Sequence, residues 1–115
     1  MKGSEPALKA AALLGFLGVA LGAFGAHWLK PILTANASAA IWQTAVLYQL
    51  VHAAASLWAA ERRPPVAWIW SAGILLFSGS LYLLALTGAH WLGAITPLGG
   101  LFFLIGWSII IIRPR

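Results

Sequence analysis

Few side chains in this sequence could do chemistry, and the most informative ones lie inside apolar stretches. Gln49 and His52 interrupt the apolar stretch at 38–60. His52 lies about eight residues, or ~12 Å, from the C-terminal end of that stretch. Polar groups at such a depth face the interior of a helix bundle, where they hold helices together or take part in function. Because histidine changes its charge near neutral pH, His52 could relay protons or bind a ligand.

The simplest interpretation of His52 is a neutral ring that hydrogen-bonds to a neighbouring hydroxyl, amide or backbone carbonyl. A proton relay or a ligand contact is the functional alternative. A metal site is the least favoured interpretation, because the chain has no cysteine and no carboxylate joins His52 inside the apolar stretch.

No pattern in the chain indicates an enzyme. The sequence contains no nucleophile elbow, zinc-protease motif, phosphate-binding loop or dinucleotide-binding motif. Its two acidic residues, Glu5 and Glu61, lie at the ends of different apolar stretches, so they are not expected to form an acid–base pair. We therefore predict no catalytic residue, no metal and no cofactor.

The composition indicates a membrane protein. Of the 115 residues, 62% are hydrophobic and 8% are charged, whereas about 25% of the residues of a soluble domain are charged. Four apolar stretches approach the ~20 residues that cross a bilayer core, and they predict transmembrane helices at 6–28, 38–60, 66–87 and 92–112. We predict a single all-α transmembrane domain over 1–115, an integral membrane four-helix bundle. The start of the fourth helix is open: either Pro97 kinks a helix that begins near Leu92, or non-helical backbone precedes Pro97.

The basic residues determine the expected orientation, because Lys and Arg are retained on the cytoplasmic side. With four spans, every Lys and Arg except Lys30 lies on the side of the two termini. We predict a multi-pass protein of the cytoplasmic (inner) membrane with both termini cytoplasmic, or on the matrix side in an organelle. Four basic residues are expected to contact anionic lipids there: Arg62, Arg63, Arg113 and Arg115. Nucleic acid is not an expected partner.

Four glycines of the first expected helix lie on one face. They are Gly15, Gly18, Gly22 and Gly25. Each glycine in a helix interior lowers the stability of the helix by roughly 0.5–1 kcal/mol relative to alanine, so four of them require a structural reason. Lipid provides little hydrophobic drive for helix association, so close backbone contact must provide it. We expect this glycine seam to pack against the polar face of the second expected helix in the same chain. A homodimer interface is the alternative.

The second and third expected helices carry polar residues at heptad-like spacing. We expect these residues to meet near the middle of the membrane as an intramembrane polar seam, which consists of Tyr48, Gln49, His52, Ser56, Ser78 and Tyr82. They either hold the helices together or line a narrow polar cavity.

Two weaker patterns lie near the expected helix ends. Five tryptophans there are typical of aromatic belts at the membrane surface: Trp28, Trp42, Trp68, Trp70 and Trp91. On the outer side, two histidines and a lysine near a helix start give a candidate site for an anion or a lipid headgroup. This candidate outer site consists of His27, Lys30, His90, Thr96 and Gly99.

Four segments of the chain have characteristic sequences and follow one another in a characteristic order: "GAFGAHWL" at 22–29, "TAVLYQLVHA" at 44–53, "FSGSLYLLALTG" at 77–88 and "LGAITPLGG" at 92–100. Together they resemble the small membrane family known as domain of unknown function 423, whose animal members are called transmembrane protein 256. The resemblance implies a compact four-helix inner-membrane protein. It brings no activity, substrate or site residue.

The expected function is non-enzymatic: a small module that packs with or stabilises a membrane complex, or that binds a lipid or another apolar ligand. The expected partners are membrane lipids, with a protein partner or a second copy of the chain as further candidates. A minimal transporter or proton conduit along the polar seam is the alternative. Haem or quinone binding through His27, His52 or His90 is the third hypothesis.

Overall fold

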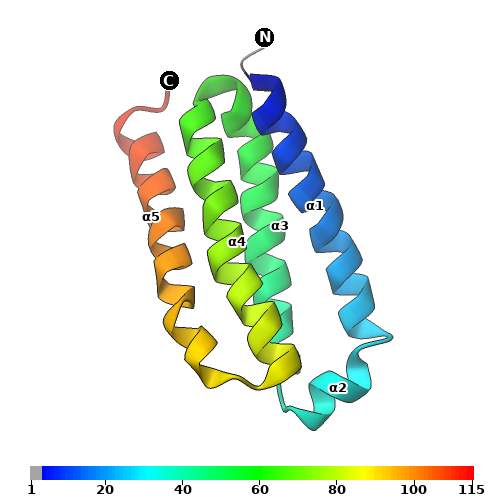
Figure 1. Cartoon of the computed structure of the whole chain (residues 1–115). Coiled ribbons are helices and arrows are strands. Elements are labelled where there is room, and N and C mark those ends of the chain that lie inside the picture. The colour runs from blue at the N-terminus through cyan, green and yellow to red at the C-terminus, as the bar shows by residue number, and fades with distance from the viewer. Residues whose placement is uncertain (1–3) are drawn as a thin grey trace.

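The computed structural model describes residues 4–115, so Lys2 lies outside the described residues. Every regular element in this range is a helix. In chain order the elements are α1 (Glu5–Ala26), α2 (Lys30–Ala35), α3 (Ala39–Arg62), α4 (Pro64–Thr87), the 3₁₀ helix η2 (His90–Ala94) and α5 (Thr96–Ile112). The four long helices alternate in direction, and the start of α1 and the C-terminus lie at the same end as the turn between α3 and α4 (Figure 1).

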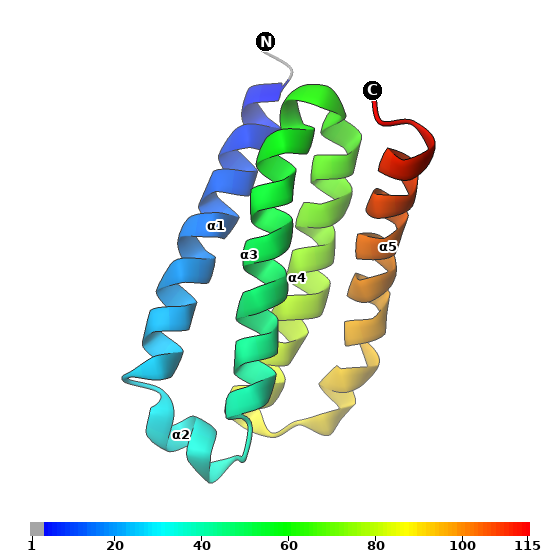
Figure 2. The same cartoon turned by 180° about the vertical axis from the view of Figure 1, so that it is seen from behind.

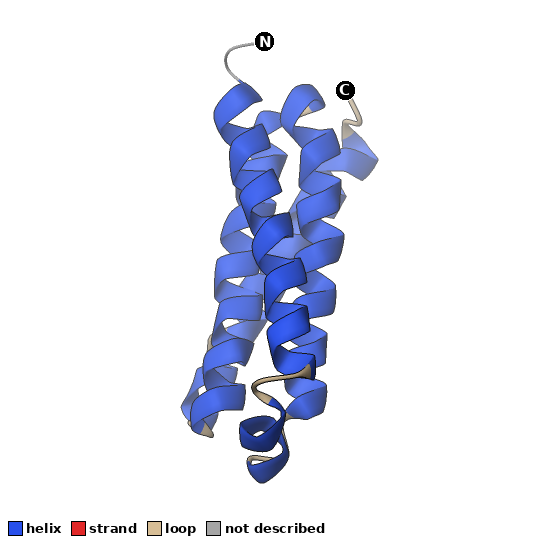
Figure 3. Cartoon of the chain, turned by 90° about the vertical axis from the view of Figure 1, so that its right-hand side faces the viewer, coloured by secondary structure: helices blue, strands red, loops and turns tan. Residues whose placement is uncertain are grey.

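The four long helices lie in an open row. α3 packs against α1 and α4, and α4 also packs against α5, whereas α1 and α5 lie at the two edges (Figures 1 and 2). The Cα atoms extend over 46 × 25 × 17 Å, so the row is thin, as the view from the α1 side shows (Figure 3). The expected four long helices are therefore present, but they do not close into a ring, because α1 and α5 make no extensive contact.

Within residues 4–115, three helical stretches are long and apolar enough to cross a membrane: Glu5–Ala26, Pro64–Thr87 and His90–Ile112. α3 also has 24 residues, which gives a helix of ~36 Å, but it is less apolar. Its polar residues Gln49, His52 and Ser56 are buried. α3 therefore buries these three polar side chains against its neighbours within the row.

Proline and glycine determine where α4 begins and ends. Arg63 alone separates α3 from α4, because Pro64 and Pro65 cannot continue α3 but fit the first turn of a new helix. At the other end Gly88 adopts a left-handed conformation with φ 73°, which glycine permits without strain.

The connections differ from the sequence-based expectation. The break after the first expected helix contains the short helix α2, which was not predicted. The fourth expected helix is divided: a 3₁₀ helix covers His90–Ala94, and α5 begins at Thr96 with Pro97 in its first turn. Neither a kinked continuous helix nor wholly non-helical backbone describes this segment, because Pro97 starts a new helix after a tighter helical turn.

The aromatic-belt prediction was wrong for two of the five tryptophans. Trp42 and Trp70 are only 3% and 1% exposed. The indole N–H of Trp42 donates to the backbone oxygen of Leu21 over 2.9 Å, and that of Trp70 donates to the backbone oxygen of Phe103 over 3.1 Å. These two indoles are satisfied by neighbouring helices rather than by water at the membrane surface.

Candidate functional site

The glycine seam of α1 faces α3. A Cβ atom at Gly18 would lie 2.7 Å from Cδ2 of Leu50, and one at Gly25 would overlap the indole of Trp42. With a Cβ at either position, the Leu50 side chain or the Trp42 indole would have to move. At these two positions the absence of a side chain allows α3 side chains to lie directly against the backbone of α1.

Gln49 joins three helices. Its amide nitrogen Nε2 donates to the backbone oxygen of Leu14 in α1 over 2.8 Å, and its oxygen Oε1 accepts from the hydroxyl of Tyr82 in α4 over 2.6 Å. Gly18 follows Leu14 by one helical turn, and a larger side chain there would lie over the Leu14 carbonyl. The glycine thus leaves that carbonyl open to the buried Gln49 amide.

Loss of the Tyr82 hydroxyl should destabilise the protein. We expect Tyr82→Phe to lower the free energy of unfolding by about 1 kcal/mol, because the buried Gln49 oxygen would lose its donor. Ser56→Ala is the matched control, since the Ser56 hydroxyl is fully buried and has no hydrogen-bond partner. Equilibrium unfolding in mixed detergent micelles measures both variants. Equal stability of Tyr82→Phe and the unmodified chain would contradict the role of Gln49 as a bridge.

His52 is held by two hydrogen bonds and an aromatic ring. Its Nδ1 lies 2.9 Å from the backbone oxygen of Tyr48, and its Nε2 lies 3.0 Å from Nε1 of Trp107. An indole N–H can only donate, so Nε2 of His52 accepts and Nδ1 carries the proton that it donates to Tyr48. The ring of Phe103 stacks on the imidazole with centroids 3.7 Å apart. His52 is therefore neutral, and a metal or haem iron at Nε2 would have to displace the Trp107 indole.

The hydrogen bonds of the polar seam form separate groups within residues 4–115. Gln49 and His52 belong to two of them. In a third group the hydroxyl of Ser78 donates to the backbone oxygen of Ala45 over 2.7 Å, and Ser56 makes no hydrogen bond. Each bonded group ends on a backbone carbonyl. The structure thus places the seam residues between helices, except Tyr48, which is 40% exposed, and it does not join them into one hydrogen-bonded chain.

The residues of the candidate outer site lie in or beside two connections. His27 and Lys30 lie at the α1–α2 connection, His90 lies at the start of η2, and Thr96 and Gly99 lie in the first turn of α5. The side chains of His27, Lys30 and His90 are exposed. By contrast, the Thr96 hydroxyl lies 2.6 Å from that of Ser80, and Gly99 is buried where a Cβ would overlap the backbone of Phe77. Thr96 and Gly99 therefore take part in packing between α4 and α5.

The four arginines expected to contact lipid lie at the end of the row that carries both termini (Figure 1). Arg62, Arg113 and Arg115 are exposed, and the Arg62 guanidinium lies 4.9 Å from the centre of the Trp58 ring. Arg63 donates to the backbone oxygen of Arg115 over 3.3 Å. This bond keeps the α3–α4 turn beside the C-terminus.

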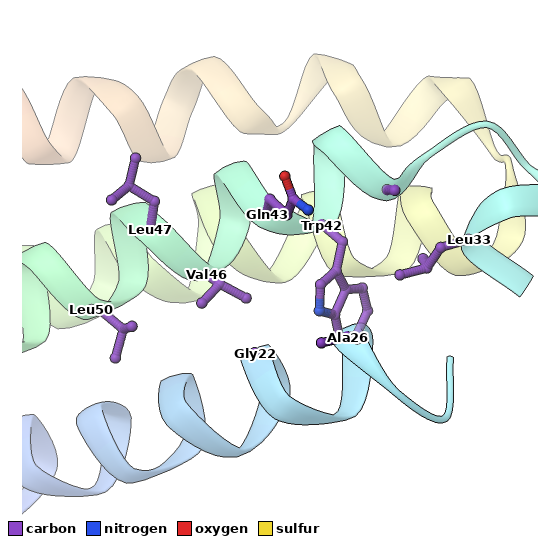
Figure 4. A pocket seen from close by; sticks show the side chains of 10 residues that line it. Gly22, Ala26, Leu33, Trp42, Gln43, Val46, Leu47 and Leu50 are labelled. Atoms are coloured by element: carbon purple, nitrogen blue, oxygen red, sulfur yellow. The ribbon is translucent and has the colours of Figure 1, made fainter. Parts of the chain in front are cut away.

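Among the hollows along the row within residues 4–115, two lie between α3 and an edge helix. The first, of about 380 Å³, lies between α1 and α3, and there Trp42, Val46 and Leu50 point from α3 toward Gly22 of α1 (Figure 4). The second has a volume of about 470 Å³ and lies between α3 and α5, with α4 contributing Phe77. We call it the α3–α5 groove; its lining includes Tyr48, His52, Phe77, Gly100, Leu101 and Trp107.

Comparison with known proteins places the chain in a family. The family described as "Protein of unknown function (DUF423)" matches residues 21–100. The chain belongs to this family. The DUF423 match includes the polar seam, the groove between α1 and α3, and the start of α5 up to Gly100. Four residues that line the α3–α5 groove lie beyond it: Leu101, Phe103, Leu104 and Trp107.

Relatives of this DUF423 member are named as membrane proteins. The "UPF0382 membrane protein" of Staphylococcus epidermidis is 40% identical over 115 residues, covering 88% of each chain. YwdK of Bacillus subtilis is 41% identical over 110 residues, which cover 88% of this chain and 89% of YwdK. The "inner membrane protein YgdD" of Escherichia coli is 43% identical over 110 residues, which cover 89% of this chain and 83% of YgdD. No solved structure matches. The DUF423 chain is therefore a membrane protein of a family with no assigned role.

Proposed function

We propose that this protein is a non-enzymatic module of the bacterial cytoplasmic (inner) membrane that binds a lipid or another apolar ligand. The observation that carries the proposal is the α3–α5 groove of about 470 Å³. Ligand sites usually measure about 300–1,000 Å³ and combine apolar walls with a few polar groups. The groove meets this description, whereas the bonded polar groups between the helices are satisfied by one another and by backbone carbonyls.

We further propose four spans, with both termini on the cytoplasmic side. α3 and α4 have 24 residues each and run antiparallel beside each other (Figure 1), so both would cross the same thickness of membrane. The buried polar side chains of α3 lie away from the surrounding lipid. Arginines gather at the end with the termini, and Lys30 is the basic residue of the opposite end, which agrees with retention of basic residues inside the cell.

Single-cysteine labelling tests the orientation, because the chain has no cysteine of its own. Thr34 in α2 and Pro65 at the start of α4 are both exposed. We expect a membrane-impermeant maleimide to label Thr34→Cys in intact spheroplasts and to label Pro65→Cys only after permeabilisation. Labelling of Pro65→Cys in intact spheroplasts would overturn the proposed orientation.

Mass spectrometry of the protein extracted with its surrounding lipids tests the binding role. We expect an apolar molecule to remain bound after the bulk lipid is removed. Gly100→Leu should abolish retention, because the new side chain would extend into the α3–α5 groove. Recovery of empty protein alone would overturn the binding role, and recovery of a stoichiometric protein partner in its place would favour packing within a membrane complex.

A further inference from the structure

Tyr48 carries a hydroxyl without a partner in the middle of α3. The chain has two tyrosines. The hydroxyl of Tyr82 donates to Gln49, whereas that of Tyr48 makes no hydrogen bond to any residue within 4–115. Tyr48 is 40% exposed and follows the start of α3 by about nine residues, or ~14 Å. Its side chain is too short to bring the hydroxyl to either end of the helix.

A hydroxyl at this depth requires a hydrogen-bond partner. With four spans, the middle of α3 lies in the hydrocarbon core, where water does not satisfy polar groups. The ester and phosphate oxygens of phospholipids lie near the membrane surface, not at the depth of Tyr48. The partner must therefore be an apolar molecule that carries a hydrogen-bond acceptor into the core, or a polar group of another protein chain.

The surroundings of Tyr48 favour a small flat molecule. Its ring contacts that of Phe77 with centroids 4.7 Å apart, and it lies nearly parallel to the rings of His52 and Phe103, each 6.2 Å away. All four rings line the α3–α5 groove. Aromatic walls of this kind pack well against a planar ring.

The other polar side chains of the groove are already paired. Nε2 of His52 accepts from Trp107, and Nδ1 of His52 bonds to the backbone of Tyr48. Among the described side chains that line the groove, Tyr48 is therefore the one whose hydrogen-bond donor has no acceptor. A ligand with a carbonyl oxygen would satisfy it.

We propose that the α3–α5 groove binds a planar, lipid-soluble carbonyl compound of the quinone class, and that the Tyr48 hydroxyl donates a hydrogen bond to one of its ring carbonyls. The ring packs against Phe77 and the neighbouring aromatic side chains, and an apolar tail follows Leu101 and Leu104 along α5. The inference rests on the proposed ligand-binding function and adds to it the ligand class and the group that recognises it.

Titration of the full-length protein in phospholipid nanodiscs tests this inference. The probe is decylubiquinone, and decylbenzene is the control compound with the same tail and no carbonyl. We expect decylubiquinone to raise the thermal unfolding midpoint saturably. Tyr48→Phe should weaken its apparent affinity about tenfold, because one hydrogen bond is lost. The same variant should bind decylbenzene as the unmodified chain does. Since Tyr48→Phe removes no hydrogen bond within residues 4–115, it should fold normally.

Two glycine variants separate the groove from the rest of the surface. A Cβ at Gly100 would lie 3.8 Å from Cδ2 of Phe77, and one at Gly79 would meet no atom within 4 Å. Gly100 lines the α3–α5 groove, whereas Gly79 lines a different hollow beside Ser80. Gly100→Leu should abolish saturable binding of decylubiquinone, and Gly79→Leu should leave it unchanged.

The outcomes separate this inference from the function on which it rests. Equal affinity of Tyr48→Phe and the unmodified chain for decylubiquinone would overturn the role of Tyr48. Absence of saturable binding, with lipid still retained in mass spectrometry, would overturn the quinone class and leave the binding role intact. Empty protein in both experiments would overturn both. A dimer that Tyr48→Phe dissociates, measured by sedimentation, would assign the hydroxyl to a second copy and overturn the ligand inference.

Discussion

Gly99→Ala is expected to lower the free energy of unfolding by about 2–3 kcal/mol, although alanine is the better helix former. A Cβ at Gly99 would overlap the backbone nitrogen of Phe77 and lie 2.7 Å from its Cα. A side chain could rotate away from such a contact, but the backbone of a regular helix cannot. α4 and α5 would have to separate, and the bond between Ser80 and Thr96 would lengthen. Equilibrium unfolding in mixed micelles measures the loss.

Gly100→Ala is the matched control for this prediction. It changes the next residue of the same helix, where the added Cβ would lie 3.8 Å from Cδ2 of Phe77, an ordinary van der Waals distance. We expect stability to stay unchanged or to rise by up to about 1 kcal/mol through helix propensity. If both variants lost the same stability, close contact between α4 and α5 would not be the reason for glycine at position 99.

Gly25→Ala is expected to cost about 2–3 kcal/mol, as overpacking adds to the loss of a hydrogen bond. Its Cβ would overlap the indole of Trp42, which is 3% exposed and donates to Leu21. The Trp42 indole would have to move out of its packed position, and its hydrogen bond to the backbone oxygen of Leu21 would break. Unfolding measurements should show the loss together with a change in the fluorescence of Trp42, measured in a chain that retains this tryptophan alone.

Gly15→Ala tests whether the stability loss of Gly25→Ala is specific to the contact with Trp42 or is shared by the whole glycine seam. A Cβ at Gly15 would lie 3.9 Å from Cβ of Ala53, so the substitution should be neutral or slightly stabilising. If the seam were instead an interface between two copies of the chain, the stability loss of Gly25→Ala would depend on protein concentration. A loss that is independent of concentration is expected for packing within one chain.

A recurring arrangement links the glycines to the buried polar groups. Gln49, Trp42 and Trp70 each donate to a backbone carbonyl of a neighbouring helix. In each case a glycine follows that carbonyl by about one helical turn, and in α5 this glycine is Gly106, where a Cβ would overlap the Trp70 indole. A helical carbonyl can accept a second hydrogen bond, provided that no side chain covers it. In an apolar environment, such a second hydrogen bond to a backbone carbonyl satisfies a side-chain donor without a further polar residue as its partner.

Much of the architecture could be predicted from the sequence, because it depends on local properties of the chain. Composition indicated a membrane protein, and the prolines at 64 and 65 indicated the tight turn between α3 and α4. The spacing of Gly15, Gly18, Gly22 and Gly25 placed them on one helix face. The face that carries Gln49 and His52 followed from the same periodicity, and the family followed from short segments in a fixed order.

The tertiary structure decided which surfaces meet. Lipid is as apolar as the side chains of the helices, so hydrophobicity does not distinguish the inside of the row from its outside. The sequence therefore could not predict that α1 and α5 lie apart, that Trp42 and Trp70 are buried, or that the Trp107 indole bonds to His52, 55 residues away in the chain. For the same reason the sequence placed Tyr48 in a polar seam, whereas only the packing of α3, α4 and α5 makes Tyr48 part of the wall of an open groove.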